Sequence, residues 1–116
     1  MRDLIDLKGA SGAVYRFNLL RDGRPLSPMG GNFAYVREAG EGYEVIHVGE
    51  GQNLLTDARA LWDQAVREHG AAHLFTRLNI TERVRQHEHA DIVAAARPPM
   101  NSPPKAPQTP APSDAG

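Results

Sequence analysis

Two histidines flank a glutamate at residues 87–89, and histidine and glutamate are residue types that bind metals or transfer protons. In an α-helix, residues two positions apart point about 200° away from each other, so His87 and His89 cannot chelate one ion together. A zinc-binding helix needs its two histidines four positions apart. The spacing therefore predicts a solvent-exposed His87 and an inward-facing His89.

His89 and His47 are the histidines best placed to do chemistry. His89 shares a helical face with Arg85 and Ile92, and this face should pack toward a sheet. His47 alternates with Val45 along an expected strand. Each is either a core histidine with a satisfied ring or an acid, base or ligand in a site, and the sequence leaves both interpretations open.

The segment from Gly49 to Asn53 joins an expected strand to an expected helix, a place where phosphate groups can bind. It lacks the Gly-Lys-Ser/Thr ending of a P-loop, and Glu50 would repel a phosphate. A tight strand-to-helix turn is therefore the stronger interpretation. The chain has no cysteine, which excludes disulfides, cysteine zinc sites and thiol catalysis.

Hydrophobic periodicity predicts the elements that position these residues. Gly70 is expected to cap the first helix, and Asn79 with Glu82 has the spacing of a capping box before the second. The order, a hairpin followed by hairpin–helix–strand–helix, favours an α+β fold with a small mixed or antiparallel sheet flanked by helices. The expected strands are 4–7, 13–20, 33–38, 43–48 and 73–78, and the expected helices are 53–69 and 80–96.

The chain of 116 residues has room for one domain, which we place at residues 1–101. Residues 102–116 contain five prolines among small polar residues, and we expect a disordered tail there. That tail is either a simple tether or a ligand for a proline-binding module.

The net charge and the hydropathy of the chain indicate whether DNA or a membrane is an expected partner. The formal net charge is −1, which counts against strong nonspecific binding to DNA. No apolar run is long enough for a signal peptide or a membrane span, so we expect a cytoplasmic protein without a membrane partner.

Four short segments, taken in order, resemble the GIY-YIG nuclease superfamily. The resemblance covers residues 31–101, and the hairpin at 4–20 looks like the N-terminal extension of some small bacterial members. It implies a GIY-YIG-like scaffold in which Gly49, Asn53 and Asn101 keep their family positions. The segments are Phe33-Ala34-Tyr35-Val36, Ile46-His47-Val48-Gly49, Asn53-Leu54, and Ile92-Val93 followed by Pro98-Pro99-Met100-Asn101.

The resemblance also implies a chemistry, which is metal-dependent hydrolysis of DNA phosphodiesters. In the family, two hairpin tyrosines, an arginine on the first helix and a metal-binding glutamate on the later helix carry it out. Positive charge from the arginine and a divalent cation stabilises the phosphate, where negative charge develops.

Both hairpin positions depart from that pattern. Ala34 occupies the position of the first tyrosine, and Tyr35 is one residue further on, which places it on the opposite face of the strand. His47 occupies the position of the second tyrosine.

Both helix positions depart as well. Asp57 stands where the arginine is expected, and Arg59 is two positions further along. His89 stands at the metal-binding glutamate, with Glu88 adjacent but about 100° around the helix. Replacing a carboxylate with an imidazole changes the ligand from one that suits magnesium to one that suits zinc or no metal.

Three functional interpretations follow. The first is a non-catalytic GIY-YIG-like module that needs no cofactor and binds nucleic acid, weakly if DNA, or a protein. The second is an endonuclease using Mg²⁺ or Mn²⁺, in which His47 and His89 act as acid, base or ligand and Arg59 or Arg85 contacts the phosphate. The third is an interaction scaffold that acts through the proline-rich tail.

Overall fold

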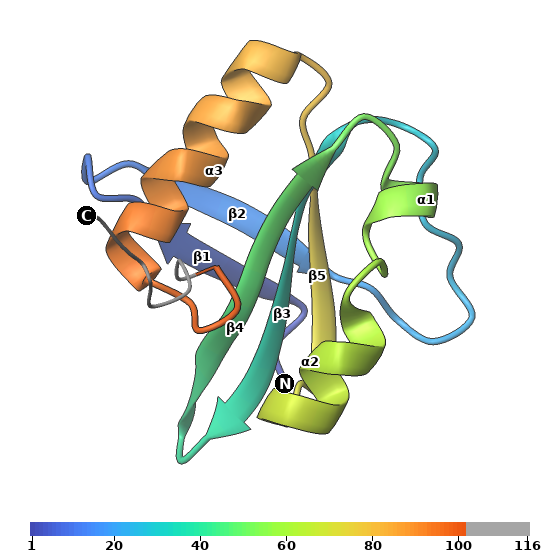
Figure 1. Cartoon of the computed structure of the whole chain (residues 1–116), viewed down its shortest axis with the longest axis vertical. Coiled ribbons are helices and arrows are strands. Elements are labelled where there is room, and N and C mark those ends of the chain that lie inside the picture. The colour runs from blue at the N-terminus through green and yellow to red at the C-terminus, as the bar shows by residue number, and fades with distance from the viewer. Residues whose placement is uncertain (102–116) are drawn as a thin grey trace, which may run out of the picture.

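The elements follow the predicted order closely and form one antiparallel sheet of five strands with helices packed on it (Figure 1). The computed structural model describes residues 1–101. The strand order is β1-β2-β5-β3-β4. The strands are β1 (Leu4–Lys8), β2 (Val14–Leu19), β3 (Gly31–Ala39), β4 (Gly42–Gly51) and β5 (His73–Leu78), and the helices are α1 (Leu54–Asp57), α2 (Trp62–His69) and α3 (Glu82–Ala96).

The strand β3 connects β4 to the rest of the sheet, because it pairs with both β4 and β5. The N-terminal hairpin joins the same sheet through β2 and β5, with Asn18 opposite Thr76 and Leu19 opposite Phe75. The hairpin at 4–20, which the resemblance places outside the core, is therefore part of the main sheet.

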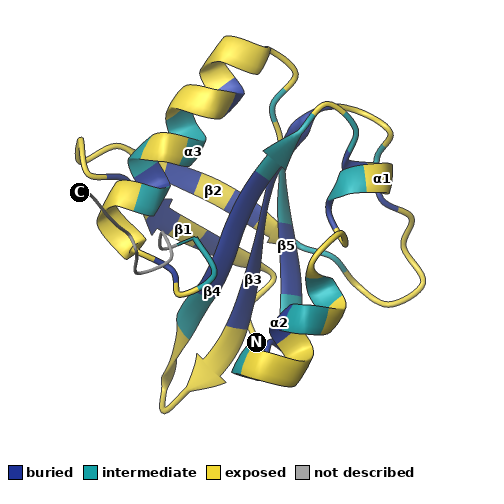
Figure 2. Ribbon diagram, viewed as in Figure 1, coloured by how far each residue is buried: buried dark blue, intermediate teal, exposed yellow. Residues whose placement is uncertain are grey.

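Each face of the sheet carries its own apolar core (Figure 2). On one face, Ile92 of α3 belongs to a core with side chains from all five strands, among them Phe17, Val36 and Phe75. On the other face, Leu54 of α1 and Ala65 of α2 pack with side chains of β3, β4 and β5. Alternation along β3 sends successive residues to the two cores, so every residue from Gly31 to Val36 is buried.

A β-bulge changes the faces predicted for β4. Tyr35 lies opposite His47, but Val36 lies opposite Val45, so Ile46 is an extra residue in β4. The predicted alternation of His47 with Val45 is therefore wrong. Val45 packs with the core under α3, whereas the His47 ring lies 5.1 Å, centre to centre, from the ring of Tyr35.

The single helix predicted at 53–69 is wrong, because the chain leaves the helix between α1 and α2. The Tyr35 hydroxyl donates to the Ala58 carbonyl at 2.7 Å and accepts from the Leu61 amide at 3.2 Å. This buried hydroxyl therefore bonds backbone groups on both sides of the break. The predicted cap at Gly70 is confirmed, with φ at 71°.

The predicted capping box at Asn79 and Glu82 is also wrong. The helix α3 begins after Thr81, which makes no side-chain capping hydrogen bond. The Asn79 side-chain NH₂ group instead donates to the side chains of Asn32 and Glu88, both at 2.9 Å. Because Asn79 lies two residues before the N-cap position at Thr81, its side chain does not cap the helix and bonds to β3 and α3 instead.

The segment after α3 covers the outer edge of β4. The Met100 amide donates to the Ile46 carbonyl at 3.1 Å. The Asn101 side chain accepts from the Val48 amide at 2.7 Å and donates to the Val48 carbonyl at 2.8 Å. This arrangement satisfies edge groups that could otherwise pair with another chain. The tail predicted at 102–116 lies outside the described residues.

Candidate functional site

Arg85 is the most deeply buried charged residue in the described part of the chain. Its side chain is 3% exposed and donates to Glu50 at 2.7 Å, with further bonds to the carbonyls of Asn79 and Ile80. Gly30 provides the necessary room, since a Cβ there would lie 2.7 Å from an Arg85 nitrogen. Buried charges are held in this way by a partner and by several hydrogen bonds.

A chain of polar side chains extends from Arg85 across β3 and β5. The fully buried Asn32 donates to the Arg85 carbonyl at 3.1 Å and accepts from Asn79. Glu88 of α3 then accepts from Asn79 and from Arg77, both at 2.9 Å. Every one of these groups has a partner, so this network fixes α3 on the sheet.

Unlike the polar groups of this network, His47 and His89 each have a buried ring nitrogen that lacks a hydrogen-bond partner. Among the described residues, their Nδ1 atoms are the buried side-chain nitrogens or oxygens without a hydrogen-bond partner. Burial, with a smaller contribution from His89, lowers the pKa of His47 to about 4. Burial also lowers the pKa of His89, although Glu50 opposes this shift. Both rings are therefore neutral near pH 7.

The structure brings His47, His89 and Glu50 near one another, and this donor set can be compared with a metal site. The described residues contain no group of three or more His, Asp or Glu side chains that could hold a metal ion together. The Glu50 carboxylate already accepts a hydrogen bond from Arg85. Two imidazoles do not match the oxygen ligands that Mg²⁺ and Mn²⁺ prefer. The residues present therefore do not fit the divalent cation that the second interpretation requires.

The other family positions have structural roles. Ala34 is fully buried in the core beneath α3. Asp57 accepts from the Asn53 amide at 3.3 Å and from the Thr56 hydroxyl at 3.1 Å. Asn53 caps α1 by accepting from the Leu55 amide at 3.0 Å. Gly49 is required by packing, since a Cβ there would lie 2.2 Å from the ring of Phe33.

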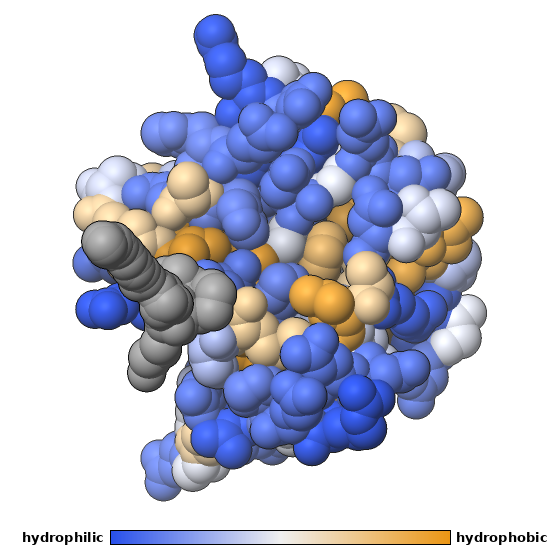
Figure 3. Space-filling model, viewed as in Figure 1, coloured by the Kyte–Doolittle hydropathy of each residue, from blue (hydrophilic) through white to orange (hydrophobic). Residues whose placement is uncertain are grey.

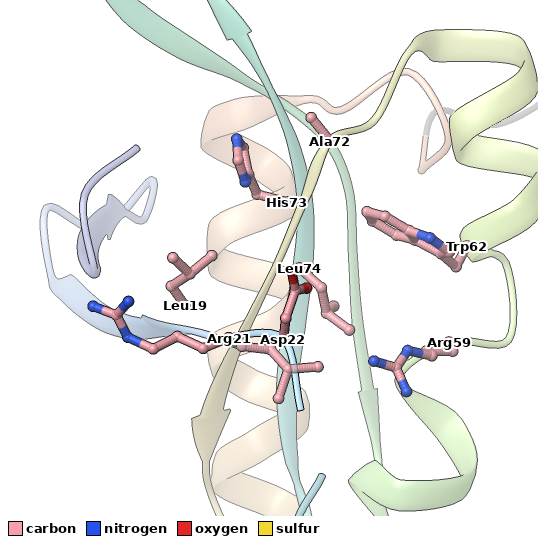
Figure 4. A pocket seen from close by; sticks show the side chains of 9 residues that line it. Leu19, Arg21, Asp22, Arg59, Trp62, Ala72, His73 and Leu74 are labelled. Atoms are coloured by element: carbon pink, nitrogen blue, oxygen red, sulfur yellow. The ribbon is translucent and has the colours of Figure 1, made fainter. Parts of the chain in front are cut away.

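Arg59 lines a groove of about 600 Å³ between the α1–α2 segment and the ends of β2 and β5, and neither His47 nor His89 is among the residues that line it (Figure 4). We call this the Arg59 groove. Trp62 lies beside Arg59 on one side, and Arg21 and His73 line the other (Figure 4). Its remaining lining residues are Leu19, Leu20, Asp22, Ala72 and Leu74.

The basic side chains that line the Arg59 groove differ in whether a carboxylate lies beside them. Arg21 forms an ion pair with Asp3, and His73 contacts Glu38 at 2.9 Å. Arg59 is exposed and takes part in none of the ion pairs between described residues. Its guanidinium is thus free to meet an anion, with the Trp62 indole beside it.

Sequence reasoning missed Asn32, Trp62 and Arg21 as site residues. An asparagine inside the apolar run of β3 signals a buried polar contact, and this signal was available. Trp62 and Arg21 are 41 positions apart in the chain, as their numbers show, and no spacing rule connects them.

The surface in front of β4 is mostly hydrophilic, with hydrophobic side chains gathered near its middle (Figure 3). No described helix is long and apolar enough to cross a membrane.

A comparison of the chain with protein-family models, with curated proteins and with solved structures finds no match.

Proposed function

We propose that this chain is a non-catalytic, GIY-YIG-like module that binds single-stranded nucleic acid weakly through the Arg59 groove. The observation that carries the proposal is the free guanidinium of Arg59 beside the indole of Trp62. A guanidinium binds a backbone phosphate, and an indole stacks on a base whatever its sequence.

The positions that would perform hydrolysis support a binding role over a catalytic one. Arg85 is held by Glu50, Asp57 is held at the start of α1, and Ala34 has no reactive group. Neither His47 nor His89 lines the Arg59 groove. A phosphate bound by Arg59 would therefore have no general base or metal ligand from these histidines beside it.

The expected affinity is low. The net charge is −1, and the groove offers one free guanidinium and a second that is shared with Asp3. Nonspecific binding through a few phosphates gives dissociation constants of about 10⁻⁴–10⁻⁶ M at physiological salt.

Fluorescence anisotropy with a labelled twelve-nucleotide oligo-dT measures this binding. Arg59→Ala should weaken it and reduce the slope of log K against log salt by about 0.7, the value for one phosphate contact on a single strand. Trp62→Leu should cost roughly 1–3 kcal/mol by removing the stack. Arg67→Ala is the control, since Arg67 is exposed on the same helix as Trp62 but does not line the groove.

An abasic oligonucleotide separates stacking from charge. It should bind wild type and Trp62→Leu equally, because it offers phosphates without bases. Wild-type binding that Arg59→Ala leaves unchanged would refute the proposed site.

A further inference from the structure

The break between α1 and α2 runs against the preference of the local sequence. Residues 54–69 contain no glycine or proline, which are the residues that most disfavour a helix interior, and their apolar spacing predicts one continuous helix. Leu61 nevertheless has φ at −114° and ψ at 17°, far from the helical values of about −63° and −42°. A contact from outside the segment therefore holds the break open.

The Tyr35 hydroxyl stands in the place of helical hydrogen bonds at the break. In a continuous helix each amide would donate to the carbonyl four residues earlier. The Leu61 amide instead donates to the Tyr35 hydroxyl at 3.2 Å. The Trp62 amide donates to the Arg59 carbonyl at 3.1 Å, which leaves the Ala58 carbonyl to accept from the hydroxyl at 2.7 Å. A side chain inserted into the helical ladder in this way is a known cause of sharp kinks.

The Tyr35 side chain is held firmly where it makes these bonds. It is fully buried, and its ring centre lies 5.2 Å from that of Trp62, with the two rings nearly perpendicular at 82°. Burial raises the pKa of the hydroxyl above its ordinary value of 10, although the Leu61 amide and the Arg59 guanidinium act in the opposite direction. The hydroxyl therefore stays protonated at neutral pH and can donate to the Ala58 carbonyl.

The break also decides how Arg59 and Trp62 lie relative to each other. Their backbones are joined by a hydrogen bond across three residues, and side chains three residues apart in such a turn eclipse each other. Both side chains line the Arg59 groove (Figure 4). In a continuous helix, with 3.6 residues per turn, they would point about 60° apart. Joining the two helices would therefore separate the guanidinium from the indole.

We propose that Tyr35 is the positioning residue of the Arg59 groove. Its hydroxyl holds the break open and so keeps the side chains of Arg59 and Trp62 aligned, and the consequence for binding rests on the proposed nucleic-acid function. Tyr35 itself touches no ligand, because it is fully buried and does not line the groove. Without the hydroxyl, the segment moves toward the continuous helix that its sequence favours.

The variant Tyr35→Phe tests the effect on conformation, because it keeps the ring and removes the hydroxyl. The three-bond coupling between the amide proton and the Hα of Leu61, measured by NMR, reports the φ angle of that residue. The coupling should fall in Tyr35→Phe as φ moves from −114° toward about −63°. Tyr43→Phe is the matched control and should leave the coupling unchanged, since the Tyr43 hydroxyl makes only a weak bond of 3.5 Å.

Fluorescence anisotropy with the twelve-nucleotide oligo-dT tests the effect on binding. Tyr35→Phe should weaken binding as far as Arg59→Ala does and lower the slope of log K against log salt by about 0.7. Tyr43→Phe should bind as wild type does. Thermal melting confirms that each variant is folded under the conditions of the measurement.

The double variant Tyr35→Phe/Ala60→Gly separates positioning from a general loss of stability. Ala60 is exposed at the break, and glycine disfavours a helix interior by about fivefold relative to alanine. The glycine should therefore reopen the break, raise the Leu61 coupling toward its wild-type value and restore part of the lost binding. General destabilisation predicts the opposite, because a glycine would weaken the fold further.

The two measurements distinguish failure of this proposal from failure of the proposed function. An unchanged Leu61 coupling in Tyr35→Phe would overturn the proposal, and so would unchanged binding when the coupling falls. Binding that Ala60→Gly lowers further in the Tyr35→Phe background would also overturn it. If wild type does not bind oligo-dT, the proposed function is refuted, and the coupling alone decides whether the hydroxyl holds the break open.

Discussion

At the residue scale, the buried His47 makes the stability of the folded protein depend on pH. Its folded-state pKa of about 4 lies below the ordinary value of 6.5. Between these values the unfolded chain binds a proton that the folded chain does not, so stability decreases as pH falls through this window. The loss from His47 amounts to at most about 3 kcal/mol, and the lowered pKa of His89 acts in the same direction.

The variant His47→Phe tests this link. A phenyl ring preserves an aromatic contact with Tyr35 but binds no proton, so the loss of stability between pH 6.5 and 4 should be smaller than in wild type. Urea unfolding at several pH values measures it. His87→Phe alters an exposed histidine on α3 and serves as the control. Identical pH profiles for wild type and His47→Phe would contradict the prediction.

Tyr35 gives a second prediction at this scale. Tyr35→Phe leaves the ring in the core but removes the hydroxyl that bonds Ala58 and Leu61. The free energy of unfolding should fall by about 1–3 kcal/mol, because a buried carbonyl loses its partner. Tyr43→Phe is the matched control. Its hydroxyl makes only a 3.5 Å bond at a partly exposed position, so it should change stability by less than about 0.5 kcal/mol.

At the element scale, the Arg85–Glu50 ion pair joins α3 to the end of β4. Glu50→Gln leaves a cation that is 3% exposed without its counter-ion, and we expect a loss of about 3–5 kcal/mol. The double variant Arg85→Met/Glu50→Gln removes the stranded charge and should be more stable than the sum of the single variants predicts. Chemical denaturation of the four proteins in this cycle provides the test, and strictly additive losses would show that the pair is not coupled.

Several elements could be predicted because their signals are local. The strand at 73–78 matches β5, and Gly70 caps α2 with the positive φ that glycine favours. The break between α1 and α2 could not be predicted, because it depends on the hydroxyl of Tyr35, which comes from a distant strand. The bulge at Ile46 and the hydrogen bond from the Asn79 side chain to Asn32 are likewise set by contacts across the sheet.

The candidate site shows the same division. His89 was expected to face inward and His87 to be exposed, and helix periodicity alone gave both. The burial of Arg85 against Glu50 joins residues 35 positions apart, and the Arg59 groove collects its lining from three separate stretches of chain. Local spacing cannot reveal either arrangement, because both arise only when the sheet is assembled.

At the scale of the whole molecule, the charge is nearly balanced, and its free cations are distributed over the surface. Binding to nucleic acid should therefore be weak and strongly reduced by salt.

The central claim is binding without catalysis, and one measurement tests it most directly. Labelled single-stranded DNA is incubated with wild type and Arg59→Ala, with Mg²⁺, Mn²⁺ or Zn²⁺, and both bound and cleaved DNA are quantified. We expect weak binding that Arg59→Ala reduces, and no cleavage above that of a His47→Phe/His89→Phe variant under any metal. Metal-dependent cleavage by wild type that is lost in the double histidine variant would contradict it and identify an active nuclease.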